Sequence, residues 1–248
     1  MQRLVKYDLK ATSRARMKRL LIFERVKVLR RERSKCLLSV LKKKNPVIVF
    51  SDEKHFTIDS ATNSRTDRFI SPLKTKDVPE NIKCKFTSKH PAGIMRFGAV
   101  ASNGLKMPPV FIKSGVKMIT DVYVDILKKH VLPWVKANFG APQNVVFQQD
   151  GAPCHTSNRT QTWLKENMNF WPKVIWPPSS PDLNPLDYSI WAFVQAKACE
   201  SSHRSVDSLK ASIIKAWASM SETYVTKVCS RFRSRLEKVI ENEGGHFE

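Results

Sequence analysis

The chain has 248 residues, of which 42% are hydrophobic and 9% aromatic, so it can fold around a substantial core and is neither fibrous nor disordered. Its 43 Lys and Arg against 22 Asp and Glu give a net charge of +21, which indicates a polyanionic partner. The apolar runs, such as Val47–Phe50, are far shorter than the ~20 residues of a membrane span, and the N-terminus lacks the apolar stretch of a secretory signal. These features exclude membrane and secreted classes and predict an intracellular protein.

The cysteines support the same compartment. There are five, an odd number, and they are spread along the chain without a C-x-x-C pair: Cys36, Cys84, Cys154, Cys199 and Cys229. This usage is typical of a reduced intracellular protein and argues against a disulfide framework or a structural zinc site.

The first 45 residues are predicted to form a basic helical linker. They hold sixteen Lys and Arg and three Asp and Glu, a net charge of +13, and Leu37, Leu38 and Leu41 recur at helical spacing. We interpret this segment as facing nucleic-acid phosphates, the alternative being a solvated helix that packs one face on the next domain. The residues expected to grip a DNA backbone are Arg14, Arg16, Lys18, Arg19, Arg25, Arg30, Arg31 and Arg33.

Residues 46–248 are predicted to form one α/β domain. Short apolar or alternating segments predict strands at 47–50, 55–59 (a second strand or a continuation), 94–101, 110–113, 144–150 and 174–176. Helical spacing predicts helices at 122–139, with Pro133 marking a kink or an end, at 157–167, from about 186, and two after Val206 with a break near Ser221. Residues 60–92 are polar, basic and aperiodic, and are expected to form a long loop insertion.

Three acids share one kind of setting. Asp52 and Asp150 follow short apolar strands, and Asp187 lies at the start of a predicted helix. Strand ends and a neighbouring helix start can direct carboxylates to one point, and such a cluster is costly unless cations neutralise it. Oxygen ligands favour Mg²⁺ or Mn²⁺, and two such ions can activate a nucleophile and stabilise the leaving oxygen of a phosphodiester. The pattern therefore predicts a two-metal nuclease-type site.

Four segments resemble the catalytic domain of mariner-superfamily transposases. They are Ser51-Asp52-Glu53-Lys54, residues 97–104 (FGAVASNG), residues 147–155 (FQQDGAPCH) and residues 176–188 (WPPSSPDLNPLDY). The resemblance implies a ribonuclease H-like fold, with a mixed five-stranded sheet flanked by helices, that cuts and joins DNA with two Mg²⁺ or Mn²⁺ ions. Mapped by motif, the catalytic and metal-binding acids are Asp52, Asp150 and Asp187, the last two separated by thirty-six residues.

The resemblance also implies partners and a location. They are transposon-end and target DNA, a homodimer in the DNA complex, no nucleotide cofactor, and the nucleus. Family members normally begin with paired helix-turn-helix domains, whereas this sequence opens in the linker, so we expect either a fragment or a catalytic domain alone. Two other functions remain open: a domesticated, non-catalytic DNA-binding protein, and a ribonuclease H-like nuclease acting on RNA or hybrids.

Several neighbouring residues have less certain roles. Asp182, in a Ser-Pro-Asp turn, is the alternative third ligand, although a turn hydrogen bond is its ordinary role. Glu53 alternates away from Asp52 in an extended strand, so a supporting or surface role is expected. His155 is interpreted as a contact to DNA phosphate or as a support for the Asp150 loop, with plain packing as the alternative.

Overall fold

The computed structural model describes residues 21–43, 46–61, 68–84 and 86–247. In these residues one mixed sheet contains strands β1 (Val47–Thr57), β2 (Gly93–Ala101), β3 (Val110–Ile112) and β4 (Val145–Gln148). The order across the sheet is β3-β2-β1-β4; β1 pairs antiparallel with β2 and parallel with β4. β1 runs unbroken through both predicted segments, so residues 55–59 begin as its continuation.

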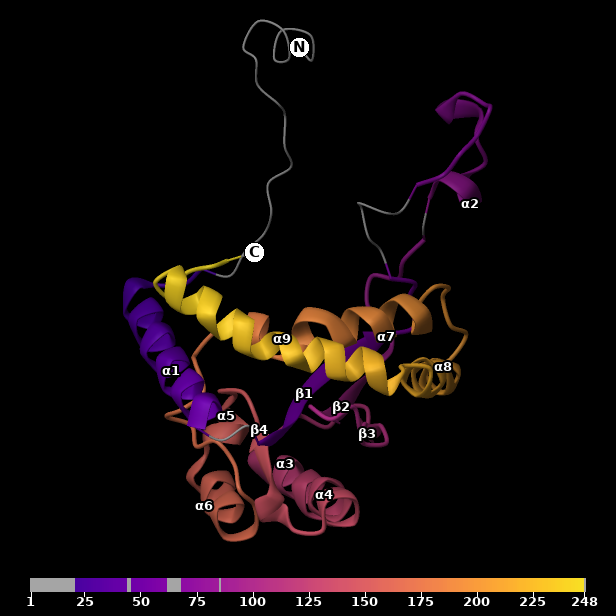
Figure 1. The fold of residues 1–248 in the computed structure, drawn as a ribbon. Coiled ribbons are helices and arrows are strands. Elements are labelled where there is room, and N and C mark those ends of the chain that lie inside the picture. The colour runs from indigo at the N-terminus through magenta and orange to yellow at the C-terminus, as the bar shows by residue number, and fades with distance from the viewer. Residues whose placement is uncertain (1–20, 44–45, 62–67, 85, 248) are drawn as a thin grey trace, which may run out of the picture.

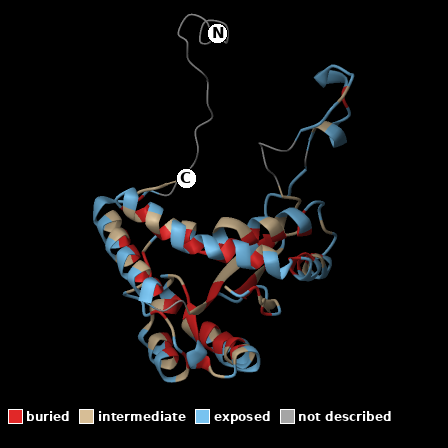
Figure 2. Ribbon diagram, viewed as in Figure 1, coloured by how far each residue is buried: buried red, intermediate tan, exposed pale blue. Residues whose placement is uncertain are grey.

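Helices cover both faces of this sheet (Figure 1). Alternate residues of each strand enter different cores: Phe50 and Val100 pack towards the C-terminal helices, and Val49 and Ala99 pack towards the central helices. The first core includes α7 (Trp191–Ala198), α8 (Val206–Ala218) and α9 (Glu222–Glu241), and the second includes α3 (Thr120–Ile126), α4 (Leu132–Phe139) and α6 (Asn158–Asn167). Figure 2 shows the buried residues concentrated in the sheet and on the inner sides of these helices. The predicted α/β class and ribonuclease H-like layering are confirmed.

The predicted helix at 122–139 is one continuous helical segment that contains a π-helical turn, Leu127–Val131. The turn ends at Val131, two residues before Pro133, which has no N–H to donate to the preceding turn. The Leu132 N–H instead reaches back five residues to the Leu127 carbonyl. Pro133 therefore neither ends the helix nor leaves it regular.

The other helix boundaries follow their capping residues. Ser157 accepts a hydrogen bond from the Thr160 N–H at the start of α6, and Ser221 accepts one from the Tyr224 N–H at the start of α9. The predicted break near Ser221 is thus confirmed. A short helix, α5 (Pro153–Thr156), precedes α6, and a second π-helical turn, Leu186–Ile190, leads into α7.

The predicted strand at 174–176 is wrong. The described chain forms a turn there, in which the Ile175 N–H bonds to the Pro172 carbonyl, and Val174 is exposed. Pro172 and Pro177 bracket the segment, and neither can donate to a sheet ladder. The place beside β4 is taken by a single parallel bridge between Phe147 and Phe170, so the described residues contain four of the five expected strands.

The basic segment contributes a helix, α1 (Glu24–Lys43), that packs against α9. Leu37 and Leu41 are buried in the core beside the C-terminal helices, whereas Leu21 and Phe23 are exposed. One face of α1 therefore packs on the domain, and the contact of its exposed basic residues with phosphates stays a prediction. The boundary predicted at residue 45 stays a prediction, because residues 44–45 lie outside the described ranges.

The insertion between β1 and β2 stands away from the body and carries α2 (Glu80–Lys83) and a short 3-10 turn, Thr75–Asp77 (Figure 1). Its described part exposes large apolar side chains, among them Phe69, Ile70, Leu73, Ile82 and Phe86. Within the described ranges, no helix has both the length and the apolar character needed to cross a bilayer.

Candidate active site

The sheet places Asp52 and Asp150 side by side. In the parallel pairing of β1 with β4, Phe50 is level with Gln148, and each acid lies two residues further along its own chain. The Ser51 hydroxyl donates to the Gln148 carbonyl at 2.8 Å, which ties the two chains together where they begin to diverge. Parallel pairing thus brings the two acids close together, although Asp52 lies within β1, which continues to Thr57, and only Asp150 follows the end of its strand as predicted.

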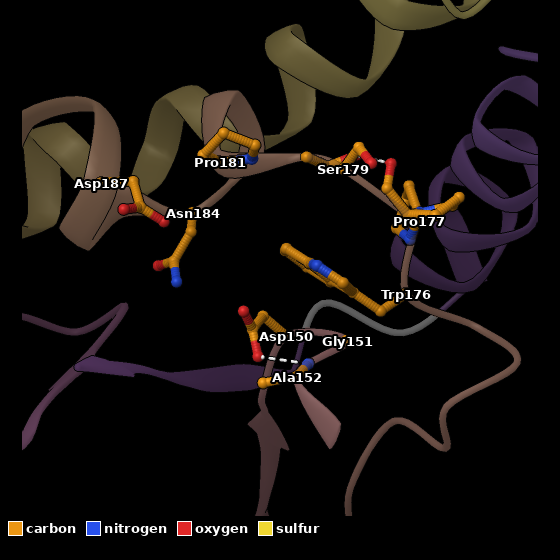
Figure 3. A pocket seen from close by; sticks show the side chains of 11 residues that line it. Asp150, Gly151, Ala152, Trp176, Pro177, Ser179, Pro181, Asn184 and Asp187 are labelled. Atoms are coloured by element: carbon orange, nitrogen blue, oxygen red, sulfur yellow. Dashed lines mark hydrogen bonds between the residues drawn. The ribbon is translucent and has the colours of Figure 1, made fainter. Parts of the chain in front are cut away.

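Asp187 reaches the same edge from the opposite side. It lies in the π-helical turn before α7, and together with Asp150 and Asn184 it lines a cavity of about 430 Å³ (Figure 3). The buried Asn184 side chain links β1 to the segment that carries Asp187. Its amide donates to the Ser51 carbonyl at 3.1 Å, and its oxygen accepts from the Leu186 N–H at 3.2 Å. Asp187 is thereby held facing the strand ends.

Asp52 is partly buried and has one oxygen engaged. The Trp191 indole donates from Nε1 to Asp52 Oδ2 at 2.5 Å. Burial, and then the negative charges of Asp187 and Glu53, raise the pKa of Asp52 to about 8. Gly98 lies opposite Asp52 on β2, and a Cβ there would be only 2.6 Å from the Trp191 ring, so glycine leaves room for this indole.

Asp150 has a different environment. Its Oδ1 accepts from the Ala152 N–H at 2.9 Å and lies 2.5 Å from Nδ1 of His155. Partial burial acts to raise the pKa of Asp150, but the hydrogen bond and charge of His155 outweigh it, and the net shift is downward. Asp187 behaves like Asp52, because its enclosure and then the charge of Asp150 raise its pKa to about 6.

The three acids fit a hard divalent cation. They supply only carboxylate oxygens, the donors that Mg²⁺ and Mn²⁺ prefer. Burial, and then the charges of neighbouring acids, raise the pKa values of Asp52 and Asp187, so a cation among the acids would favour their ionised forms. In the part of the chain that the structure describes, no group of three His, Cys, Asp or Glu side chains has the spacing of a finished metal site.

The proline-rich turn at 177–185 is anchored by α1. The Arg30 guanidinium donates to both carboxylate oxygens of Asp182, at 2.8 Å for Oδ1, and to Ser180 Oγ at 2.8 Å. Arg33 donates to the Trp176 carbonyl at 2.8 Å, and from α9 Arg235 donates to the Asp182 carbonyl at 2.8 Å. Asp182 is thus engaged by an arginine, which removes it as the alternative metal ligand.

Two of the predicted DNA contacts are corrected by burial. Arg30 has no exposed surface, because it is enclosed against the proline-rich turn, so its guanidinium cannot reach a DNA backbone. His155 is only 2% exposed and lies between two carboxylates, so it supports the Asp150 loop and does not contact phosphate.

The other basic residues have varied settings. Arg25 is exposed, and Arg31 and Arg33 are partly exposed. The remaining predicted contacts lie outside the described residues: Arg14, Arg16, Lys18 and Arg19.

Sequence reasoning missed the residues that hold the acids in place. Trp191, Asn184 and the Arg30–Asp182 pair act across large separations; Trp191, for example, is 139 residues from Asp52. The supporting roles of Glu53 and His155 could have been suspected from the sequence, since each follows a proposed metal-binding acid within five residues.

A mixed sheet between two helical layers, with acids from two parallel strands facing an acid at the start of a helix, defines a ribonuclease H-like domain. No protein-family model matches the chain. Among curated proteins, it is 29% identical over 198 residues to the transposable element Tcb1 transposase of Caenorhabditis briggsae, covering 79% of this chain and 68% of that protein. The homologues of this chain are Tc1/mariner transposases.

Solved structures of the Mos1 transposase share the fold. The paired-end complex with the left transposon end matches with a TM-score of 0.81 at 20% identity, covering 100% of this chain and 75% of that one. The Mos1 catalytic domain with raltegravir and Mn matches with a TM-score of 0.72 at 20% identity, covering 93% of this chain and all of that one. The chain thus shares the fold of the Mos1 transposase, including the whole of its catalytic domain.

Proposed function

We propose that this domain cleaves phosphodiester bonds of DNA and joins the strands to a target, using two Mg²⁺ or Mn²⁺ ions held by Asp52, Asp150 and Asp187. The observation that carries the proposal is that Asp150 and Asp187 line one cavity, while Asp52 lies beside Asp150 in the sheet and close enough to Asp187 for that charge to raise the pKa of Asp52. When bound, the ions would activate a water or a 3′-hydroxyl and stabilise the leaving oxygen. The Mos1 catalytic domain has been solved with Mn and with Mg, which supports this choice of cofactor.

The three acids differ in how readily they ionise at neutral pH. Asp150 would offer an ionised oxygen to a cation at neutral pH, because its pKa is lowered. Asp52 and Asp187 hold protons more tightly, and a bound cation would favour the loss of these protons. Trp191 keeps Asp52 Oδ2 engaged, and the turn held by Arg30 limits the movement of Asp187.

DNA is the polyanion that the charge of +21 is proposed to bind. Related Mos1 structures include a paired-end complex with the left transposon end and a strand transfer complex, which supports transposon-end and target DNA as partners. The protruding insertion exposes apolar side chains such as Ile70 and Phe86, which suits a contact with a second protomer, so a homodimer in the DNA complex is part of the proposal. Nuclear localisation stays a prediction.

The alternative functions have less support. A domesticated, non-catalytic DNA-binding protein has no physical need to keep three facing carboxylates, which repel one another. A nuclease acting on RNA or hybrids would use the same acids, and only the substrate separates it from a transposase.

The test is metal-dependent nicking. Asp150→Ala should abolish Mg²⁺-dependent nicking of supercoiled DNA while leaving salt-sensitive DNA binding intact, because the backbone contacts of the basic residues do not involve Asp150. Glu166→Gln, an exposed acid on α6, is the matched control and should nick like the parent chain. Cleavage that persists in Asp150→Ala or in EDTA would refute the metal role, and a preference for RNA or hybrid over duplex DNA would favour the nuclease alternative.

A further inference from the structure

We propose that Glu53 and His155 are positioning residues that set the orientation of the Asp150 carboxylate for ion binding. The imidazole lies between the two acids and directs one Asp150 oxygen away from the cavity, so that the other faces it. This inference rests on the proposed function, since it assumes that Asp150 is a metal ligand.

The contacts form a continuous chain from β1 to the loop after β4. His155 Nδ1 lies 2.5 Å from Asp150 Oδ1, and His155 Nε2 lies 3.3 Å from Glu53 Oε1. The Ala152 N–H also donates to Asp150 Oδ1 at 2.9 Å, so that oxygen has two donors. Figure 3 shows the second oxygen of Asp150 directed into the cavity.

The His155 ring is itself held on other sides. It is 2% exposed, and the buried Tyr123 ring lies against it with centroids 4.1 Å apart. Gln149 and Gln161 donate to the His155 carbonyl at 3.0 and 2.9 Å, and Tyr123 donates to the Gln149 side-chain oxygen at 2.7 Å. The ring therefore cannot turn without breaking buried contacts, and it acts as a fixed support.

Glu53 acts on Asp150 through the His155 imidazole. In an extended strand, successive side chains point to opposite faces, so Glu53 leaves β1 on the face away from its neighbour Asp52. Glu53 Oε1 and His155 Nε2 are both buried, and within the described part of the chain neither has a hydrogen-bond partner of ideal geometry. At 3.3 Å each is the nearest opposite group available to the other, so removing one leaves a buried polar atom alone.

Groups that orient a metal ligand affect how tightly the ion binds. Changing such an outer partner typically weakens metal affinity by about 10- to 100-fold. Glu53 touches Asp150 through the imidazole, so the part of its effect that acts on Asp150 should vanish once the imidazole is gone, whereas its charge acts on Asp52 and Asp187 with or without the imidazole. This dependence separates a positioning chain from two independent electrostatic contributions.

The experiment measures Mn²⁺ affinity of the full chain without DNA, from the electron paramagnetic resonance signal of free Mn²⁺. We expect His155→Ala to weaken Mn²⁺ binding about 10- to 100-fold and Glu53→Gln to weaken it less. The double variant should lose less affinity than the sum of the two single losses, because the effect of Glu53 on Asp150 passes through His155. His155→Asn, whose amide can still donate to Asp150, should bind like Glu53→Gln, and Glu166→Gln should bind like the parent chain.

Metal-free thermal unfolding of each variant is measured alongside. Should His155→Ala fail to fold, Glu53→Gln and His155→Asn carry the test, since both keep a polar side chain of similar size. Parent-like affinity in these two variants would overturn the positioning role, and so would additive losses in the double variant.

Asp150→Asn separates this failure from that of the proposed function. If Asp150→Asn binds Mn²⁺ like the parent chain, the metal role of Asp150 itself is wrong. If it loses Mn²⁺ while the Glu53 and His155 variants do not, only the positioning role is wrong.

Discussion

Asp52 and Asp150 owe their positions to main-chain pairing between β1 and β4, whereas Asp187 owes its position to side chains that reach the proline-rich turn from α1 and α9. The side of the site formed by β1 and β4, here called the first wall, is therefore held by many backbone hydrogen bonds, each of small effect. The side formed by the proline-rich turn and Asp187, here called the second wall, depends on a few contacts, above all the buried Arg30–Asp182 pair. Single substitutions should damage the second wall more than the first, and the following predictions test this difference.

The largest effect is expected at Arg30. Arg30→Met keeps the length of the side chain but leaves Asp182 without its cation, and breaking such a buried pair costs about 3–5 kcal/mol. We expect this loss in the free energy of unfolding from urea denaturation, together with reduced nicking, because the turn that carries Asp187 loosens. Arg25→Met, at an exposed position of the same helix, is the control and should change stability little. An unchanged unfolding free energy in Arg30→Met would show that the second wall does not depend on this pair.

Removal of the Asp52 charge should stabilise the metal-free protein at alkaline pH. The pKa of Asp52 is about 8 in the folded chain and lower when unfolded, so the folded state loses stability as pH rises from about 4 through 8. Asp52→Asn removes this loss, and we expect it to be more stable than the parent chain by about 2–4 kcal/mol at pH 9.

The difference in unfolding free energy between Asp52→Asn and the parent chain, measured as a function of pH, tests this prediction. Urea denaturation in EDTA should give equal stability for the two chains near pH 4 and a gap that widens up to pH 9. Saturating Mg²⁺ should narrow the gap, because the ion stabilises only the ionised carboxylates. A gap that is constant with pH would contradict the raised pKa.

The Asn184 side chain links the first wall to the second. Asn184→Ala removes the bond to the Ser51 carbonyl and leaves this buried acceptor and the Leu186 N–H with fewer partners, which costs about 1–3 kcal/mol. We expect nicking to fall by more than the stability loss explains, because the distance between Asp187 and the strand ends is no longer fixed. Nicking assays well below the unfolding midpoint measure this, and parent-like activity there would show that Asn184 serves stability alone.

The smallest effect is expected within the first wall. Ser51→Ala removes one hydrogen bond between β1 and β4, from the hydroxyl to the Gln148 carbonyl, and should cost about 1 kcal/mol with little change in nicking. The remaining ladder between the strands keeps Asp52 and Asp150 level. A large loss of activity in Ser51→Ala would contradict the expectation that single substitutions damage the first wall less than the second.

The sequence indicated the first wall better than the second. Apolar strands followed by acids are local patterns, and parallel strands place such acids together, so Asp52 and Asp150 could be found within a few residues of their signals. The partner of Arg30 lies 152 residues away, and nothing in its local sequence distinguishes a buried arginine from a DNA-binding one. The strand expected at 174–176 failed for a local reason, since its flanking prolines outweighed three apolar residues.

The π-helical turn Leu186–Ile190 has a consequence for how this domain can vary. A helix advances about 100° per residue, and a π-helical turn accommodates one residue more than a regular turn would. Deleting a single residue from this turn would leave a regular helix and keep the third carboxylate at nearly the same angle to α7, whereas deleting one residue from a regular helical turn would swing it by about 100° around the axis. Angular phase relative to α7, rather than the length of chain between the second and third acids, is therefore the quantity that insertions and deletions in this region must preserve.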